Sequence, residues 1–150
     1  MFRTLRHGRA AAVVFAVAAL AACAEMDQEM AGEASLYDRL GGQDAIVAVV
    51  DDFIANVAAD ERINGFFAKT DIPALKGKLV DQVCAGSGGP CEYTGQDMKT
   101  AHAGMAITED QFNAMGEDML MTLDKFAVPE QEKGEVMALL GSMQGDIVGQ

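Results

Sequence analysis

Apolar residues recur in this sequence with the spacing of one helix face, and no segment shows the sustained alternation of a strand. The clearest pattern follows i, i+3, i+4, i+7 steps and consists of Ile46, Val49, Val50, Phe53, Ile54 and Val57. Similar spacing returns in residues 75–83, 112–126 and 136–147. The pattern predicts an all-α protein, and a length of 150 residues fits one globular domain.

Local signals mark where these helices begin and end. A Ser35–Asp38 capping box predicts a short helix that the Gly41–Gly42 pair stops, and Pro73 suits the first turn of a later helix that Gly86 to Pro90 ends. Three further expectations are a short helix with Met98 and His102 that ends at Gly104, a helix opened by a Thr108–Gln111 capping box that buries Phe126, and a last helix from Pro129 through Ile147.

The first 22 residues have the organisation of a secretory signal. Arg3, Arg6 and Arg9 precede an uncharged apolar run over residues 10–22, which is short for a membrane span. The run ends Leu20-Ala-Ala-Cys23, which resembles the lipobox of bacterial lipoproteins, where the cysteine is acylated and becomes the first residue. An uncleaved signal anchor with an incidental cysteine is the alternative.

This interpretation divides the chain into a lipoprotein signal peptide (1–22), a flexible acidic tether (23–34) and a folded domain (35–150). We expect the protein to be exported, to face the periplasm and to be held at a membrane through lipid on Cys23. Ala24 is not the aspartate that is linked with inner-membrane retention in such lipoproteins, so we expect the outer membrane rather than the inner.

The charge balance excludes one class of partner. The chain has 23 acidic and 11 basic residues and a formal charge of −12. No surplus of cations is left to neutralise phosphates, so we expect no nucleic-acid binding.

His102 is the histidine that remains after removal of the signal peptide, because the other histidine is His7. It lies four residues after Met98 and three before Met105, on the apolar side of its short helix. An imidazole in this position is either a core residue with one hydrogen-bond partner or the single axial ligand of a haem iron. Metal sites that need two or three histidines cannot be built from one such chain.

The cysteine pair and a cluster of three lysines each allow two interpretations. Cys84 and Cys91 either form a local disulfide across the glycine loop, as an oxidising compartment favours, or remain independent thiols. Lys69, Lys76 and Lys78 form either a solvated helix face or a cationic site for the two propionates of a haem.

A series of short motifs, in order over residues 35–150, resembles the group 1 truncated haemoglobins. The motifs are Ser35-Leu-Tyr-Asp-Arg-Leu-Gly-Gly42, Asp52-Phe53, Phe66-Phe67, Leu75-Lys-Gly-Lys78, Gly88-Gly-Pro90, Tyr93-Thr-Gly95, Met98-Lys99 and His102-Ala-Gly104.

The resemblance implies a truncated globin fold, a two-on-two helical sandwich with a pocket for haem b, and His102 as the proximal ligand of the iron. Phe67 matches a phenylalanine that stacks on the ring, and Thr70 and Lys78 fall where propionate partners often occur. Further matches to positions in or beside the pocket are Phe53, Ile54, Leu75, Leu79, Tyr93, Met98, Met105, Ile107 and Phe112.

The chain departs from the family where a gas ligand would be contacted. Ile54 replaces the usual tyrosine, and Leu75 and Leu79 occupy positions often filled by glutamine. A donor to dioxygen, which gains negative charge on binding, is worth about 1.5 to 3 kcal/mol, so we expect faster dioxygen release than in relatives with such donors. Gln82 lies seven residues after Leu75 and three after Leu79, so an inward orientation is the alternative, but we expect it on the surface.

The function implied by the resemblance is reversible binding of dioxygen, carbon monoxide or nitric oxide for transport, storage or sensing. A nitric oxide dioxygenase served by an electron-transfer reductase, or a peroxidase-like enzyme, is the alternative, although no acid–base residue for peroxide cleavage is visible in the pocket positions. A third hypothesis is a haem-free interaction lipoprotein, in which His102 would be a core residue.

Overall fold

The computed structural model describes residues 34–150, so the predicted signal peptide, Cys23 and the tether up to residue 33 lie outside the described residues. All regular elements of residues 34–150 are helical, which confirms the predicted all-α class. None of the helices in this range is long and apolar enough to cross a membrane.

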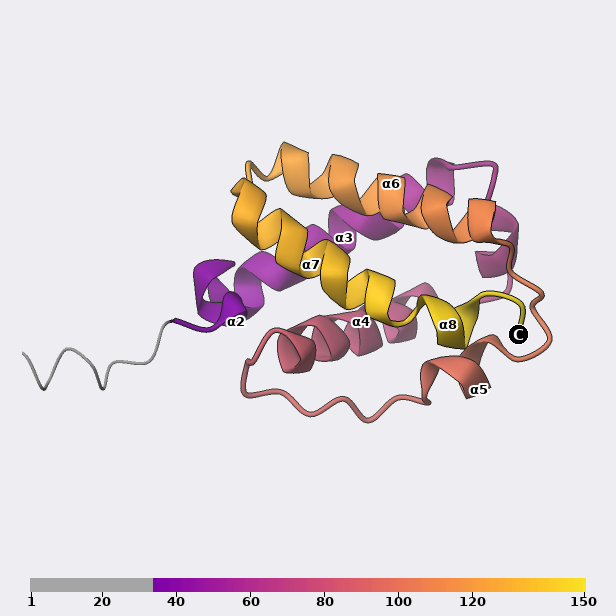
Figure 1. Ribbon diagram of the computed structural model, residues 1–150, viewed down its shortest axis with the longest axis horizontal. Helices are drawn as coiled ribbons and strands as arrows, with labels where there is room; N and C mark the ends of the chain where they lie inside the picture. Colours follow the sequence, from indigo (N-terminus) through magenta and orange to yellow (C-terminus); the bar gives the residue numbers. More distant parts are fainter. Residues whose placement is uncertain (1–33) are drawn as a thin grey trace, which may run out of the picture. The chain divides into compact units, whose positions relative to one another are not determined.

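The described part of the chain consists of α-helices of very different length and one 3₁₀ turn (Figure 1). Their bounds are α2 Leu36–Arg39, α3 Gly42–Ala59, η1 Asn64–Phe67, α4 Ile72–Gly86, α5 Met98–His102, α6 Glu109–Lys125, α7 Glu130–Ser142 and α8 Gln144–Ile147.

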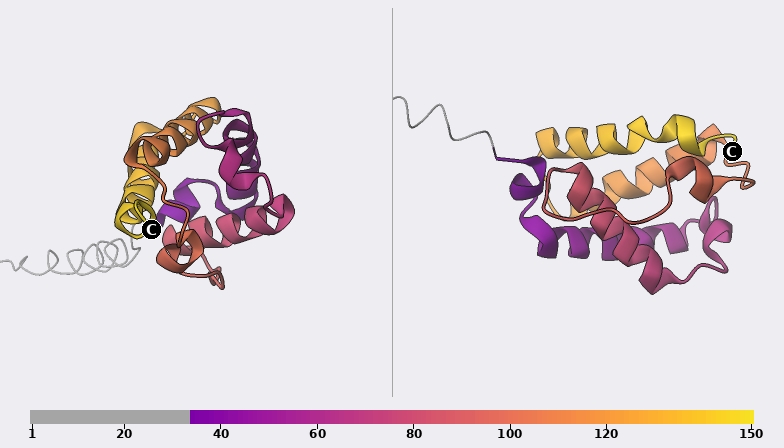
Figure 2. Two further views of the ribbon diagram at one scale, coloured as in Figure 1. Left: turned by 90° about the vertical axis from the view of Figure 1, so that its right-hand side faces the viewer. Right: turned by 90° about the horizontal axis from the view of Figure 1, so that it is seen from below.

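Two helix pairs make the sandwich. α3 packs on α4, α6 packs on α7, and α3 joins the pairs through its contact with α6. Figure 1 shows α6 and α7 side by side and running in opposite directions, and Figure 2 shows α4 crossing α3. The short α5 contacts α8, so the segment that carries His102 lies against the C-terminal end of the chain. This arrangement confirms the predicted two-on-two helical sandwich.

The predicted capping boxes are present at both helix starts. The Asp38 backbone N–H donates to Ser35 Oγ at 3.1 Å, and the Ser35 N–H donates to the Asp38 carboxylate. The Gln111 N–H donates to Thr108 Oγ1 at 3.2 Å, with the reciprocal bond at 3.0 Å. Each box satisfies N–H groups that a helix start leaves without an intrahelical partner.

Three element boundaries differ from the prediction. The last helix is divided at Met143 into α7 and α8, and Gly141 and Gly145 on either side of the division lower helix stability by about 1 kcal/mol each relative to alanine. α5 ends at His102 because Ala103 turns to an extended ψ of 126°. Phe126 is the C-cap of α6 and is 41% exposed, so the expectation that it is buried was wrong.

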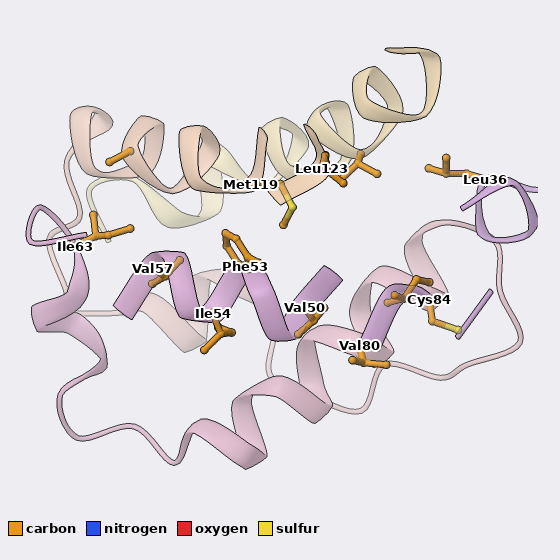
Figure 3. Close-up of a cluster of buried hydrophobic side chains, with 13 residues drawn as sticks. Leu36, Val50, Phe53, Ile54, Val57, Ile63, Val80, Cys84, Met119 and Leu123 are labelled. Atoms are coloured by element: carbon orange, nitrogen blue, oxygen red, sulfur yellow. The ribbon is translucent and has the colours of Figure 1, made fainter. Parts of the chain in front are cut away.

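The buried core runs along α3 between α4 and α6. Figure 3 shows Phe53 directed towards Met119 of α6, with Ile54 on the opposite side of α3. The periodic residues Ile46, Val50, Phe53, Ile54 and Val57 are all at most 6% exposed. Burying a side chain of this size contributes about 1.5 to 3 kcal/mol, so the apolar stripe of α3 organises both helix pairs.

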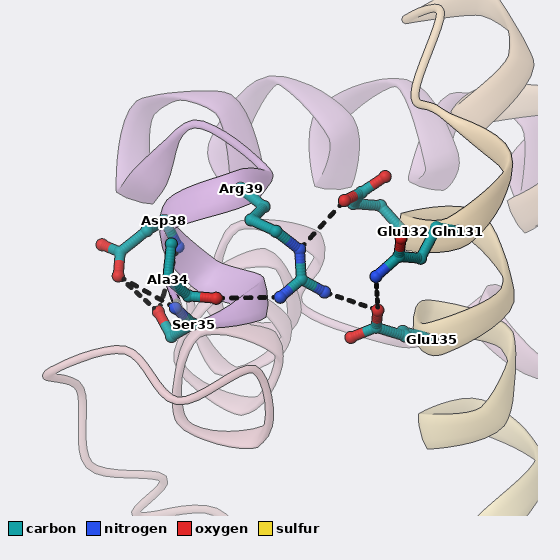
Figure 4. Close-up of polar contacts among 7 residues, drawn as sticks. All are labelled: Ala34, Ser35, Asp38, Arg39, Gln131, Glu132 and Glu135. Carbon is teal, nitrogen blue, oxygen red and sulfur yellow. Dashed lines mark hydrogen bonds and ion pairs between the residues drawn. The ribbon is translucent and has the colours of Figure 1, made fainter. Parts of the chain in front are cut away.

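An ion-pair cluster fastens the start of the domain to α7 (Figure 4). Arg39 Nε donates to Glu132 at 2.9 Å, and its terminal nitrogens donate to Glu135 and to the Ala34 carbonyl oxygen. Glu132 is only 8% exposed. The guanidinium therefore supplies the charge that a buried carboxylate on α7 requires.

Cys84 and Cys91 form a disulfide, which decides between the two alternatives left open by the sequence. The bond joins the last turn of α4 to the loop that leads to α5. Gly89 lies against it, since a Cβ there would come within 2.7 Å of Cys84 Sγ and 2.5 Å of the Tyr37 ring. The glycine loop is thus held on the end of α4 by a covalent bond and by close packing.

Candidate functional site

His102 is the last residue of α5, a helix of five residues. The Asp97 side chain caps this helix by accepting hydrogen bonds from the Thr100 N–H at 2.9 Å and the Thr100 hydroxyl at 2.7 Å. These bonds hold the pKa of Asp97 below its usual value. The cap compensates for the small number of backbone hydrogen bonds that so short a helix can form.

The imidazole of His102 is oriented by the backbone one turn earlier. Its Nδ1 lies 2.7 Å from the carbonyl oxygen of Met98. A carbonyl oxygen only accepts, so Nδ1 carries the proton, and in the neutral ring the lone pair is on Nε2. No group within residues 34–150 hydrogen-bonds Nε2. Histidines that bind metals commonly show this arrangement, in which one ring nitrogen donates to a carbonyl and the other is the ligand.

Apolar residues from three elements that were predicted to line a haem pocket pack into one hydrophobic cluster. α3 supplies Phe53 and Ile54, which are buried, and α4 supplies Leu75 and Leu79, which pack on the same hydrophobic cluster. Phe67 of η1 also packs on that cluster. These apolar side chains and an imidazole whose Nε2 has no hydrogen-bond partner among residues 34–150 are the groups that haem requires, because the porphyrin needs a hydrophobic partner and the iron needs an axial ligand.

The remaining predicted site residues differ in their exposure to solvent and in the part of the fold that they occupy. Thr70 and Lys78 are exposed, while Tyr93, Met98, Met105 and Ile107 are half-buried. The Tyr93 hydroxyl donates to the Gln96 carbonyl at 2.8 Å. Phe112 is buried but lines a groove between α6 and α7 with Gly116 and Leu140, apart from the cluster that contains Phe53. The structure thus gathers Phe53, Ile54, Phe67, Leu75 and Leu79 and sets Phe112 elsewhere.

Of the three clustered lysines, Lys69, Lys76 and Lys78, only Lys76 forms an ion pair within residues 34–150. Lys76 Nζ lies 2.7 Å from the Asp51 carboxylate of α3, and it therefore fastens α4 to α3. Lys69 and Lys78 are exposed, with no ion-pair partner within the described part of the chain.

Gln82 differs from the sequence-based expectation. It is half-buried, and its Nε2 lies 3.4 Å from Met98 Sδ and 3.1 Å from Met143 Sδ, so the side chain takes the inward orientation that was the alternative to the expected surface position. The signal was present in the sequence, because Gln82 follows Leu75 by seven residues and Leu79 by three and therefore shares their helix face. Met143 had no such signal, since only the fold brings the end of α7 to α4.

An apolar cavity of about 120 Å³ lies near the start of α3, away from His102. Residues from both helix pairs line it, among them Val49, Val83, Met119 and Val136, and half-exposed Phe126 also borders it. None of the pocket residues predicted from the sequence lines this cavity.

Comparison with known proteins gives the same family by sequence and by structure. Residues 35–148 match the family model described as bacterial-like globin. The chain is 38% identical over 114 residues to a group 1 truncated haemoglobin of Mycolicibacterium paratuberculosis, covering 76% of this chain and 84% of that protein. It is 34% identical to a group 1 truncated haemoglobin of Synechocystis, covering 72% and 90%.

Solved structures agree with this assignment. A truncated haemoglobin of Tetrahymena pyriformis in the Fe(III) form superposes with a TM-score of 0.75 at 32% identity, over 78% of this chain and 100% of that chain. The 2/2 haemoglobin of Synechococcus, solved with covalently attached haem, gives 0.72 at 34% identity, over 77% and 98%. The chain therefore belongs to the group 1 truncated haemoglobins, globins whose cofactor is haem iron and whose ligands are diatomic gases.

Proposed function

We propose that this protein binds dioxygen or another diatomic gas reversibly, as a carrier, store or sensor, with His102 Nε2 as the one protein ligand of the haem iron. The observation that carries the proposal is the hydrogen bond from His102 Nδ1 to the Met98 carbonyl oxygen, which leaves the Nε2 lone pair available. The haem supplies an iron coordination position for the gas.

The residues of this chain have distinct roles in the proposal. Phe53, Leu75 and Leu79 exclude water from the ring, and Phe67 packs against it. Thr70 and Lys78 receive the propionates, with Lys69 as a further cation, and the support is that all three side chains are exposed to solvent. Lys76 takes no part, because it is paired with Asp51.

The proposal also places the domain outside the cytoplasm. Lipid on Cys23 anchors the chain to a membrane, with the outer membrane as the expected location and residues 24–34 as the tether. The support is the lipobox-like sequence alone. Mass spectrometry of the purified protein should find an acylated N-terminal Cys23, and Cys23→Ser should release the protein into the soluble fraction. An unmodified, uncleaved N-terminus would contradict the anchor.

Replacement of His102 tests the haem site directly. His102→Gly should lose most of its haem absorbance, and added imidazole should restore it by occupying the space of the missing ring. Lys99→Ala is the matched control, because it changes an exposed residue of the same short helix and should keep the full haem content. If His102→Gly kept its full haem content without imidazole, the ligand assignment would be wrong.

A further inference from the structure

Gln82 has a half-buried amide whose nitrogen lies between two methionine sulfurs. Nε2 is 3.4 Å from Sδ of Met98 on α5 and 3.1 Å from Sδ of Met143 at the end of α7. Thioether sulfur is a weak acceptor compared with a carbonyl or carboxylate oxygen. Within residues 34–150 this amide donates to no oxygen atom, so its hydrogen-bonding capacity is incompletely used.

The amide faces the side of the molecule where His102 lies. Gln82 is on the same face of α4 as Leu75 and Leu79. The sulfur that it contacts belongs to Met98, whose own carbonyl oxygen accepts the hydrogen bond from His102. The Gln82 side chain thus joins α4 to α5 at Met98, which lies one helical turn before His102, the proposed iron ligand.

Three other polar side chains among residues 34–150 already donate to oxygen acceptors, which accept a hydrogen bond more strongly than sulfur does. The Tyr93 hydroxyl donates to the Gln96 carbonyl, and the Thr122 hydroxyl donates to the Asp118 carbonyl at 3.0 Å. The Asn56 amide donates to the Thr122 hydroxyl at 2.8 Å. Moving any of these groups would break a hydrogen bond to oxygen, whereas moving Gln82 breaks only contacts to sulfur.

We propose that Gln82 is the residue that selects among gas ligands, by leaving the two sulfurs and donating a hydrogen bond from Nε2 to dioxygen held in the haem site. The proposal rests on the haem site proposed above. A gas that gains negative charge on binding accepts such a bond more strongly than carbon monoxide does, so Gln82 favours dioxygen over carbon monoxide. Gln82 thus supplies the hydrogen-bond donor that the apolar side chains of Ile54, Leu75 and Leu79 cannot provide.

Two apolar substitutions of different shape test this role. Gln82→Leu and Gln82→Met, each loaded with haem, should release dioxygen about 10- to 100-fold faster than the parent protein in stopped-flow displacement by carbon monoxide, the effect of one lost charge-assisted hydrogen bond. Gln43→Leu, at an exposed glutamine of α3, is the matched control and should leave the rate unchanged.

The C–O stretching frequency of the carbon monoxide complex is a second, static measure. A donated hydrogen bond lowers this frequency, so both Gln82 variants should shift it upwards and Gln43→Leu should not. Release rates and frequencies equal to those of the parent, at full haem content, would overturn the role of Gln82 and leave the haem site intact. Loss of haem from His102→Gly remains the separate test of the site itself.

Discussion

The backbone N–H of Ala106 donates to the carbonyl oxygen of Gln150 at 2.7 Å, and this bond ties the segment after His102 to the last residue of the chain. The Gly149 N–H donates in turn to the Ile107 carbonyl at 2.9 Å. Because α5 also packs on α8, the short helix that carries His102 is held from its C-terminal side by residues far away in sequence. The position of the imidazole therefore depends on hydrogen bonds between two segments that are distant in sequence.

Ala106 adopts a φ of +50°, a conformation that costs an L-residue about 1 kcal/mol or more. Ala106→Gly should remove this strain, and after the extra chain entropy of glycine in the unfolded state we expect a net gain of about 0.5 kcal/mol in the free energy of unfolding. Urea denaturation measures it. Ala101→Gly, inside α5, should destabilise instead, and equal effects of both variants would refute the strain argument.

Removal of the disulfide should loosen the connection between α4 and α5. Cys84→Ala with Cys91→Ala opens a closed loop of eight residues, and we expect the free energy of unfolding to fall by about 2 to 3 kcal/mol. Alanine is chosen because Cys84 is fully buried. Reductant should destabilise the parent protein to the same extent and leave the double variant unchanged. A parent protein insensitive to reductant would contradict the prediction.

Asp118 of α6 is 3% exposed, and its Oδ2 has no hydrogen-bond partner among residues 34–150. Burial raises its pKa, the carboxylates of Asp60 and Glu117 add to the rise, and Arg62 opposes it. Since the native state holds this proton to a higher pH than the unfolded chain, the free energy of unfolding should decrease as the pH rises through the raised pKa.

Asp118→Asn keeps the side chain neutral and should abolish that decrease. We expect the variant to exceed the parent by about 1 kcal/mol at pH 7 and to lose this advantage in acid, where the parent carboxyl is protonated. Urea denaturation at several pH values makes the comparison, with Asp110→Asn on the exposed side of α6 as the control. A constant difference between parent and Asp118→Asn at all pH values would disprove the linkage.

Leu79→Gln should place an additional donor on the inward face of α4. In the haem-loaded protein we expect dioxygen release to slow by about tenfold or more, because a hydrogen bond to a ligand with partial charge contributes about 1.5 to 3 kcal/mol. Leu120→Gln changes a leucine of α6 that is 40% exposed and should have no effect. Stopped-flow displacement measures both rates, and an unchanged rate in Leu79→Gln would show that this position does not face the ligand.

Features with a local cause were predictable from the sequence. The stripe from Ile46 to Val57 predicted α3, and the Ser35–Asp38 and Thr108–Gln111 pairs predicted helix starts that the structure contains. Each depends on residues within one or two turns, so the information lies in adjacent positions. The Phe126 prediction failed because the 3.6-residue period was extended beyond Lys125, where the helix ends.

The sequence by itself determined the helical class, the helix starts and the single histidine in residues 34–150, because periodicity, capping and composition are properties of neighbouring residues. Only the tertiary structure decided which atoms the Gln82 amide contacts and that Gln150 supports the loop behind His102. Met98 and Met143 are separated by 45 residues, and their sulfurs meet the Gln82 amide only because α4, α5 and α7 converge there. Contacts between distant segments depend on the packing of whole helices, which no local pattern encodes.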